Sequence, residues 1–270
     1  MVRVFLISLF ILSFLRADLL DEKIKSLVTQ KTYEKYFRLI NKIFQSKDQF
    51  YLTKDRVDIL RVIKLLKENG LLKLFFDEPK ENFITFQTNS NPLFFMKIIE
   101  ETLLNLGYNS FLTEEIKREN ASFVWTISFV SDYTLDPELF TKFLMKKECK
   151  ITDIVREDKN RWRYVIDVDS AKLDAISLLP QEKMRLKRAI HDYWIKIDGG
   201  QKLSIASYGG NRWHPKIVVY DKNLKILKIY KQNKKTNWLV VYLPPNSYYI
   251  KISDIFTLDN LKYGLKVKVE

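Results

Sequence analysis

Short runs of alternating apolar and polar residues, separated by turns, constrain the carboxyl-terminal part of this chain more than any other feature. Seven such runs lie between Asp192 and Val269, and glycine, proline, asparagine or aspartate residues separate most of them. Alternation with a period of two indicates a strand with one buried face, and regularly spaced turns are typical of an antiparallel sandwich. The predicted strands are residues 193–197, 202–207, 216–220, 225–230, 238–243, 248–252 and 261–269.

Four segments of this region resemble the bacterial pre-peptidase carboxyl-terminal domain family. They are Tyr193–Ile205, Pro215–Asn223, Asn246–Ile252 and Tyr263–Val267, in which strands meet glycine, asparagine or aspartate turns. The chain departs from the family at Ser247, where a glycine usually precedes the paired tyrosines, and it lacks the acidic cluster that binds calcium in some members. The resemblance, confined to residues 190–270, implies a jelly-roll-like β-sandwich that usually serves secreted proteins as a non-catalytic accessory domain. We therefore place this domain at residues 191–270.

The segment 82–169 has the residue pattern of a second domain. Asn91-Pro92 and Asp136-Pro137 are helix-start signals. They precede helices predicted from 93 to 106 and from 137 onward, and the predicted strands are 82–88, 108–114, 122–130, 150–156 and 162–168. The order β-α-β-β-α-β with one added strand predicts a ferredoxin-like domain with both helices on one face of an antiparallel sheet. The whole chain is accordingly predicted to be of the α+β class.

Residues 18–81 form a predicted helical segment that ends at the start of a β-hairpin. Apolar residues recur at helical spacing from Leu19 to Phe44 and again after Lys54, and strands 71–76 and 82–88 flank a turn at residues 77–80. Helix, helix and hairpin is also the order of a winged-helix DNA-binding domain, so nucleic-acid binding is an alternative. Its phosphate contacts would be Arg56, Arg61, Lys64 and Lys67. Residues 170–190, which carry a basic run, are predicted to be a connector.

The first seventeen residues have the pattern of a signal peptide. Arg3 precedes an unbroken apolar run from Val4 to Leu15, and Ala17 follows. Twelve helical residues span about 18 Å, too short for a hydrocarbon layer of roughly 30 Å. Arg16 before Ala17 leaves an uncleaved leader open, and that leader would be the protein's one membrane contact. A periplasmic or otherwise extracytoplasmic location is expected, which argues against nucleic acid as a partner.

Charge and cysteine usage narrow the choice of partners. The formal net charge is +13, from 46 basic and 33 acidic residues, so anionic partners are favoured. An acidic protein face and an anionic glycan such as peptidoglycan both fit. Cys149 is the one cysteine, which excludes an intramolecular disulfide, and it is expected to be a small buried residue.

The loop Ser207–Pro215 is the candidate binding site. Its two glycines and its proline are explained by turn geometry alone, and a tryptophan at the end of a sandwich often caps the core. An aromatic ring beside a planar cation also suits a sugar or a partner side chain. The candidate binding residues are Tyr208, Asn211, Arg212, Trp213, His214 and Trp238.

No catalytic constellation is recognisable in the sequence. The chain has two histidines, His191 and His214, and neither lies in a nucleophile or metal-ligand motif, so no catalytic residue, metal or cofactor is predicted. The first hypothesis is therefore a non-enzymatic exported adaptor or scaffold in an envelope assembly, such as a secretion apparatus or a flagellar motor. The alternatives are a glycan- or peptidoglycan-binding module and a hydrolase with an unrecognised site.

Overall fold

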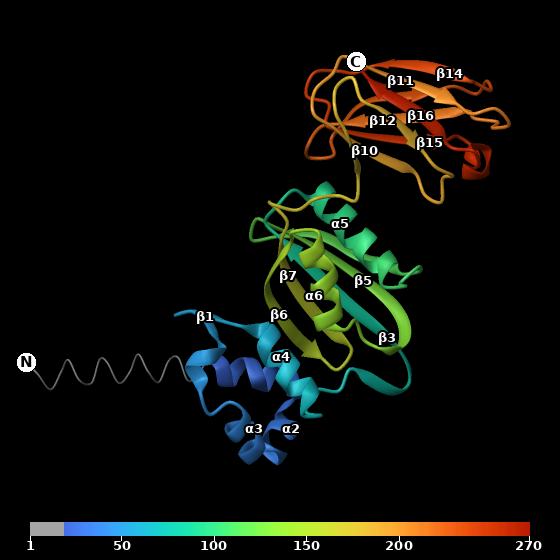
Figure 1. Ribbon diagram of the computed structural model, residues 1–270. Helices are drawn as coiled ribbons and strands as arrows, with labels where there is room; N and C mark the ends of the chain where they lie inside the picture. Colours follow the sequence, from blue (N-terminus) through green and yellow to red (C-terminus); the bar gives the residue numbers. More distant parts are fainter. Residues whose placement is uncertain (1–18) are drawn as a thin grey trace, which may run out of the picture. The chain divides into compact units, whose positions relative to one another are not determined.

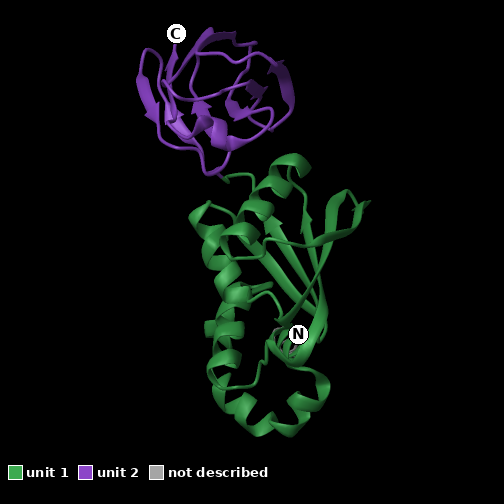
Figure 2. Cartoon of the chain, turned by 90° about the vertical axis from the view of Figure 1, so that its right-hand side faces the viewer, with its two compact units in different colours: residues 1–171 green, residues 172–270 purple. Residues whose placement is uncertain are grey.

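The computed structural model describes residues 19–270 and divides the chain into two compact units (Figure 2). Unit 1 ends at Ala171 and unit 2 runs from Lys172 to Glu270. Unit 1 combines α-helices with sheets, unit 2 consists mainly of strands, and most of the strand pairings are antiparallel. The predicted signal peptide, residues 1–17, lies outside the described residues. From residue 19 onward, no helix has both the length and the apolar character needed to cross a bilayer.

Unit 1 begins with a bundle of short helices. A helix that includes residues 19–28 is followed by α2 (Gln30–Lys35), α3 (Phe37–Ile43) and the 3-10 helix η1 (Lys47–Phe50). A small hairpin of β1 (Tyr51–Thr53) and β2 (Arg56–Val57) leads to α4 (Ile59–Glu68), which Asp58 caps by accepting a hydrogen bond from the Arg61 amide. The helical pattern is broken at Thr29, whose backbone φ of 75° cannot continue a right-handed helix.

The second part of unit 1 is a five-stranded sheet with two helices on one face (Figure 1). The elements are β3 (Phe75–Thr88), α5 (Pro92–Asn105), β4 (Leu112–Glu119), β5 (Ser122–Tyr133), α6 (Pro137–Lys146), β6 (Lys150–Asp158) and β7 (Arg161–Asp167), and the sheet order is β4-β5-β3-β7-β6. Asn91 and Asp136 cap α5 and α6, each directly before a proline, as the sequence predicts. The rings of Phe86, Phe140 and Tyr164 meet in the core at centroid separations of 5.1–6.0 Å.

The predicted hairpin between residues 71 and 88 is absent, because residues 75–88 form the single strand β3. The expected turn at residues 77–80 is instead an irregularity in the pairing of β3 with β5, between Phe75 and Lys80. A proline is tolerated in a strand at such an irregularity, and Pro79 lies inside it. Without this hairpin the described residues lack the wing that a winged-helix reader requires.

All four basic residues assigned to that DNA-binding alternative make contacts within unit 1, and three of them contact other elements. Lys67 forms ion pairs with Asp136 at 2.8 Å and Glu138 at 2.9 Å. The guanidinium of Arg56 donates to the carbonyl of Ile151 at 3.0 Å, and that of Arg61 donates to the carbonyl of Gln49 at 2.7 Å. These contacts hold α4 and the hairpin to neighbouring elements.

Unit 2 consists of two sheets that enclose one apolar core. Strands β10 (Tyr193–Ile197), β12 (Pro215–Tyr220), β13 (Ile226–Lys231) and β15 (Tyr249–Asp254) belong to one sheet. Strands β11 (Lys202–Ser207), β14 (Trp238–Tyr242) and β16 (Leu265–Val269) belong to the other, and the 3-10 helix η2 (Leu258–Leu261) precedes β16. Tyr230 on β13 donates a hydrogen bond to the carbonyl of Tyr242 on β14, so an edge of one sheet is joined to an edge of the other. All seven strands predicted here are present, with ends that shift by a few residues.

The predicted connector, residues 170–190, is not a linker but is folded into unit 2. It supplies β8 (Ile176–Leu178), parallel to β10, and β9 (Lys183–Leu186), antiparallel to β16. The sheet orders are β13-β12-β15-β10-β8 and β14-β11-β16-β9. Leu178, Leu186 and Ala189 lie in the core, so the connector contributes apolar surface as well as two edge strands.

Candidate interaction surface

The outer face of the four-stranded sheet of unit 2 presents two large aromatic side chains to solvent. Along β14 the side chains of Val241 and Leu239 face the core, so Trp238, Val240 and Tyr242 point outward. Trp238 is 63% exposed and Tyr242 is 69% exposed. Isolated exposed aromatics are common, but two on one face of one edge strand form a continuous apolar ridge.

Strand register places a cationic strip parallel to this ridge. Trp238 lies opposite Ala206 on β11, Ala206 opposite Lys266 on β16, and Lys266 opposite Arg185 on β9. The next row along the strands is Val240, Ser204, Lys268 and Lys183. The β11 positions between the aromatic ridge and the cations carry small side chains, Ala206 and Ser204. We call this surface, Trp238, Val240, Tyr242, Ser204, Ala206, Lys183, Arg185, Lys266 and Lys268, the outer face.

Part of the positive charge at one end of the outer face is neutralised. Lys202 and Lys268 contact the carboxylate of Glu270 at 2.7 Å and 3.1 Å. Hydrogen bonds from Lys202 and then Lys268 lower the pKa of Glu270. Lys183, Arg185 and Lys266 form no ion pair with the described residues, so they retain uncompensated charge for a ligand.

The loop 207–215 adjoins this surface through one contact. The guanidinium of Arg185 lies 4.7 Å from the centre of the half-buried Tyr208 ring. Arg212 is exposed in the same loop, and its backbone amide donates to the carbonyl of Asn260. Tyr208 and Trp238 of the six candidate residues thus lie at or beside the outer face.

Asn211, another candidate, is buried and holds the loop in place. Its amide nitrogen donates to the carbonyl of Gly264 at 2.7 Å and to the hydroxyl of Ser207 at 3.1 Å, and its carbonyl accepts from the amide of Tyr263 at 3.0 Å. Both ends of the side chain are satisfied within the fold. Asn211 therefore has no group left to offer a ligand.

Trp213 lies in the core of unit 2 and not on its surface. The side chain is 0% exposed, and its indole N–H donates to the carbonyl of Ser253 at 3.0 Å. A buried indole usually finds such an acceptor, because the unpaired N–H would be costly. The proposed aromatic platform is thus not formed by Trp213, and core packing accounts for the residue.

His214 lies beside a buried carboxylate, an arrangement that invites a catalytic interpretation. The Nδ1 atom of His214 is 3.8 Å from Oδ2 of Asp254, which is too long for a hydrogen bond. The carboxylate of Asp254 accepts instead from the amides of His214, Phe256 and Thr257 and from the side chain of Asn260. Its oxygens shape the loop, and they do not orient the imidazole as a general base.

Among residues 19–270, no group of three or more histidine, cysteine, aspartate or glutamate side chains is placed to bind a metal ion.

Trp238 is the one outer-face residue among the six candidates, and the residues that the sequence did not single out include Tyr242, Arg185, Lys266 and Lys268. The period of two in the predicted strands places Trp238 with Tyr242, and Lys266 with Lys268, on common faces. The register between β14, β11, β16 and β9 is what combines them into one surface, and register is set by long-range packing. Because β9 lies in the predicted connector, Arg185 could not have been assigned.

Comparison with known proteins gives limited similarity. No protein-family model and no curated protein matches the chain. Among solved structures, the chain is similar to the pre-peptidase C-terminal domain of collagenase from Bacillus anthracis, with 13% identity and a TM-score of 0.27 over 37% of this chain and 97% of that one. A β-glucosidase from Paenibacillus barengoltzii matches with 15% identity and a TM-score of 0.20 over 38% of this chain and 11% of that one. The first likeness is to the family that residues 193–267 resemble, and neither transfers a function.

Proposed function

We propose that the protein is a non-enzymatic exported adaptor or scaffold whose outer face binds an acidic partner protein in an envelope assembly. The observation that carries this proposal is the pairing, on one rigid sheet, of the exposed Trp238 and Tyr242 with the unpaired cations Arg185 and Lys266. Tryptophan, tyrosine and arginine dominate the binding energy of many interfaces. A flat, preformed surface of this kind suits binding rather than chemistry.

The two halves of the surface have different roles in this proposal. The aromatic ridge supplies apolar area, and fully burying one large side chain contributes about 1.5–3 kcal/mol. The cationic strip selects acidic partners and accelerates encounter more than it adds affinity. Because β11 and β16 are each paired with a strand on both sides, little backbone freedom is lost on binding.

The proposal extends to the fold type of each unit and to location. The sheet of unit 1 is best described as a ferredoxin-like variant, in which the hairpin β6–β7 takes the place of the last strand and leaves β7 parallel to β3. Unit 2 is best described as jelly-roll-like. Export by the predicted leader would place both units outside the cytosol, where an adaptor of an envelope assembly acts.

A glycan is the second candidate ligand for the same face. The specific observation is that the cross-strand neighbour of Trp238 is Ala206, whose side chain is a single methyl group. A sugar ring can lie against an aromatic face when no bulky neighbour blocks it. Peptidoglycan would add carboxylates for the lysines, so it is the glycan class to test.

Site-specific photocrosslinking in intact host cells tests the proposal. A photoreactive phenylalanine analogue at Trp238 should capture one defined protein, whereas the same analogue at Ile229, which is 49% exposed on the other sheet, should not. Trp238→Ala with Tyr242→Ala should abolish co-purification of that protein. Capture of glycan strands would favour the second candidate. Equal capture from both positions, or capture that survives the double substitution, would remove the outer face from the proposal.

A further inference from the structure

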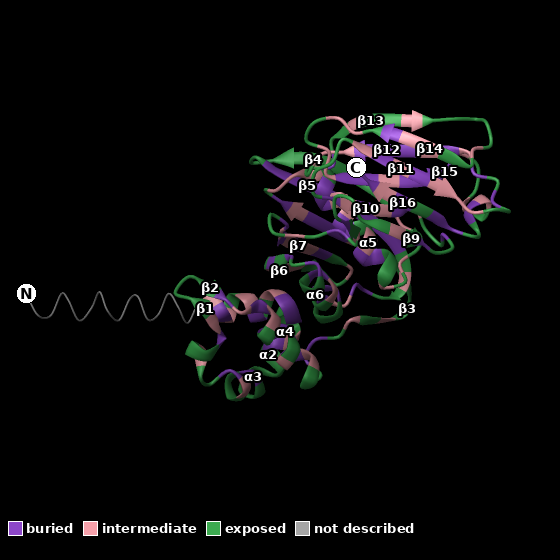
Figure 3. Cartoon of the chain, turned by 45° about the horizontal axis from the view of Figure 1, so that its top comes forward, coloured by how far each residue is buried: buried purple, intermediate pink, exposed green. Residues whose placement is uncertain are grey.

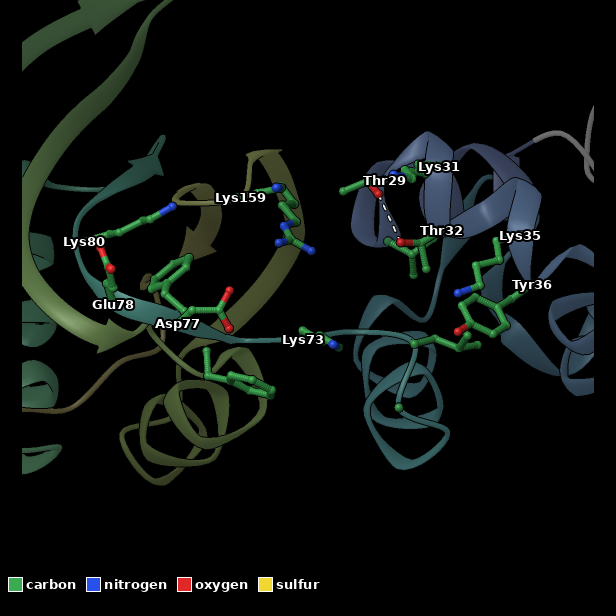
Figure 4. A pocket seen from close by; sticks show the side chains of 16 residues that line it. Thr29, Lys31, Thr32, Lys35, Tyr36, Lys73, Asp77, Glu78, Lys80 and Lys159 are labelled. Carbon is green, nitrogen blue, oxygen red and sulfur yellow. Dashed lines mark hydrogen bonds between the residues drawn. The ribbon is translucent and has the colours of Figure 1, made fainter.

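Unit 1 contains a hollow of about 660 Å³ that lies between its helical part and its sheet (Figure 4). Its walls come from residues 28–36, which include α2, from residues 70–80, which include the start of β3, and from Arg156 in β6 and Lys159 in the turn after it. These are three segments far apart in the sequence. The hollow is therefore a product of the fold and not of one loop.

Hydrogen bonds and ion pairs fix the two sides of the hollow against each other. The guanidinium of Arg156 donates to the carbonyl of Leu27 at 2.8 Å and lies 5.3 Å from the ring of Trp162. Nearby, Lys23 pairs with Asp153 at 2.6 Å. The walls are thus preformed, which reduces the ordering cost of binding.

The hollow carries a strong excess of positive charge. Two acidic side chains, Asp77 and Glu78, line it together with six basic ones: Lys31, Lys35, Lys73, Lys80, Arg156 and Lys159. None of the five lysines forms an ion pair with the described part of the chain. A concave surface lined by one sign of charge focuses the electrostatic potential and attracts counter-charged ligands.

Aromatic rings accompany three of these lysines. The ammonium of Lys35 lies 5.1 Å from the ring centre of Tyr36, that of Lys73 lies 5.8 Å from Phe75, and that of Lys80 lies 6.0 Å from Phe76. Phe75 is 52% exposed and Tyr36 is 39% exposed. A ligand in the hollow therefore meets apolar rings as well as cations.

We propose that the hollow binds an acidic peptide segment of a partner protein, in which glutamate or aspartate residues flank an aromatic or aliphatic residue. The rings of Tyr36, Phe75 and Phe76 would contact the apolar residue, and the lysines would contact the carboxylates. An inorganic polyanion could not use the rings. Phosphate recognition also favours a free arginine fork, and the one arginine here, Arg156, is engaged with Leu27 and Trp162.

This site is separate from the outer face, so it can be tested with the outer face intact. The probe is a short fluorescent peptide of glutamates interrupted by one phenylalanine, added to the chain without its first eighteen residues. Lys31→Glu, Lys35→Glu and Lys73→Glu together should weaken binding by at least about tenfold. The charge-matched control is Lys225→Glu, Lys234→Glu and Lys235→Glu, all exposed in unit 2, and it should weaken binding less than about threefold.

Two further measurements make the result specific for a peptide. Tyr36→Ala should weaken binding of the phenylalanine-containing peptide but leave binding of an all-glutamate peptide unchanged. Thermal unfolding checks that each variant remains folded. Equal weakening by the two triple variants would overturn the proposal, because net charge would then explain binding. Tighter binding of inorganic polyphosphate than of the peptide would overturn it in favour of a phosphate site.

Discussion

At the scale of single residues, Asp254 shows how one buried carboxylate organises the end of unit 2. Its side chain is fully buried and accepts four hydrogen bonds, from the amides of His214, Phe256 and Thr257 and from Asn260. These donors lie in two segments, one directly before β12 and one directly after β15. The path of the chain at His214 therefore depends on a residue forty positions later.

Replacing Asp254 by alanine is expected to lower the free energy of unfolding of unit 2 by about 2–3 kcal/mol, because buried donors would lose their acceptor. Urea unfolding followed by tryptophan fluorescence measures this change. Asp259→Ala is the matched control, because Asp259 is exposed and its ion pair with the exposed Arg188 is long at 3.5 Å. This substitution should change the free energy of unfolding by less than about 1 kcal/mol. Similar losses in the two variants would contradict the role assigned to Asp254.

Cys149 makes the stability of unit 1 depend on pH in the alkaline range. Burial raises the pKa of its thiol from 9.0 to about 12. Below pH 9 the thiol is protonated in both states, and between pH 9 and 12 only the unfolded state loses the proton. Stability is therefore lost as pH rises through this window, by about 1.4 kcal/mol per pH unit from this group.

Cys149→Ala should remove that contribution. The unfolding free energy of the wild type minus that of the variant should therefore fall as pH rises from 9 to 10. Urea unfolding at the two pH values gives this difference, and groups common to both proteins cancel. In the folded protein at pH 8 the thiol should also resist alkylation by iodoacetamide until urea is added. Rapid alkylation without urea would show that the thiol is accessible.

Trp213 and Trp238 show what the sequence can and cannot predict at this scale. Both were candidates for a binding surface, and both lie beside turns in a β-rich segment. The structure buries Trp213 completely and exposes Trp238, because Trp213 projects between the two sheets and Trp238 lies at an outward position of an edge strand. Alternation within a strand predicts the second case, but a loop residue has no periodicity that reveals its direction.

At the scale of elements, strands with apolar alternation and bounding turns were predictable, and edge strands without them were not. The strands β10 and β11 have the predicted ends, since Ile195 and Ile205 alternate with polar neighbours and glycines lie between the two strands. By contrast, β8 has three residues and β9 has charged residues at two of its four positions. Short, charged edge strands protect a sheet from further pairing, and for the same reason they lack a strand pattern.

The connector can be tested as an element by comparing two fragments. Residues 172–270 should fold cooperatively, because this fragment contains the whole core of unit 2. Residues 191–270 lack β8, β9 and the core side chains of Leu178 and Leu186, and they expose the edges of β10 and β16. We expect the shorter fragment to aggregate or to lack a cooperative thermal transition by circular dichroism. If the two fragments were equally stable, residues 170–190 would not be needed for unit 2 to fold.

The strand β3 was mispredicted for a different physical reason. A sequence of aspartate, glutamate, proline and lysine is a strong turn signal, and residues 77–80 were expected to reverse the chain. The pairing with β5 continues past this signal through an irregular register, and the edge strand β4 on the other side of β5 is exposed along its length (Figure 3). Tertiary pairing with a twelve-residue neighbour thus outweighs local turn propensity.

At the scale of the whole molecule, the net charge of +13 acts on every encounter, whichever surface binds. A positive protein attracts an acidic ligand over distances up to the Debye length, about 8 Å at physiological salt, and this attraction mainly changes the association rate. Contacts within a site mainly change the dissociation rate. Kinetics can therefore separate the charge of the molecule from the chemistry of the hollow in unit 1.

The triple substitutions Lys31→Glu, Lys35→Glu, Lys73→Glu and Lys225→Glu, Lys234→Glu, Lys235→Glu change the net charge equally, so they provide this separation. In surface plasmon resonance with the immobilised acidic peptide, both variants should associate more slowly, and raising the salt concentration should reduce the difference from the wild type. The dissociation rate should rise several-fold for the first variant and stay unchanged for the second. A ligand bound among the five lysines must dissociate faster when three of them become repulsive. If the two variants had the same dissociation rate, the lysines would act only through the net charge of the protein and would not form a binding site.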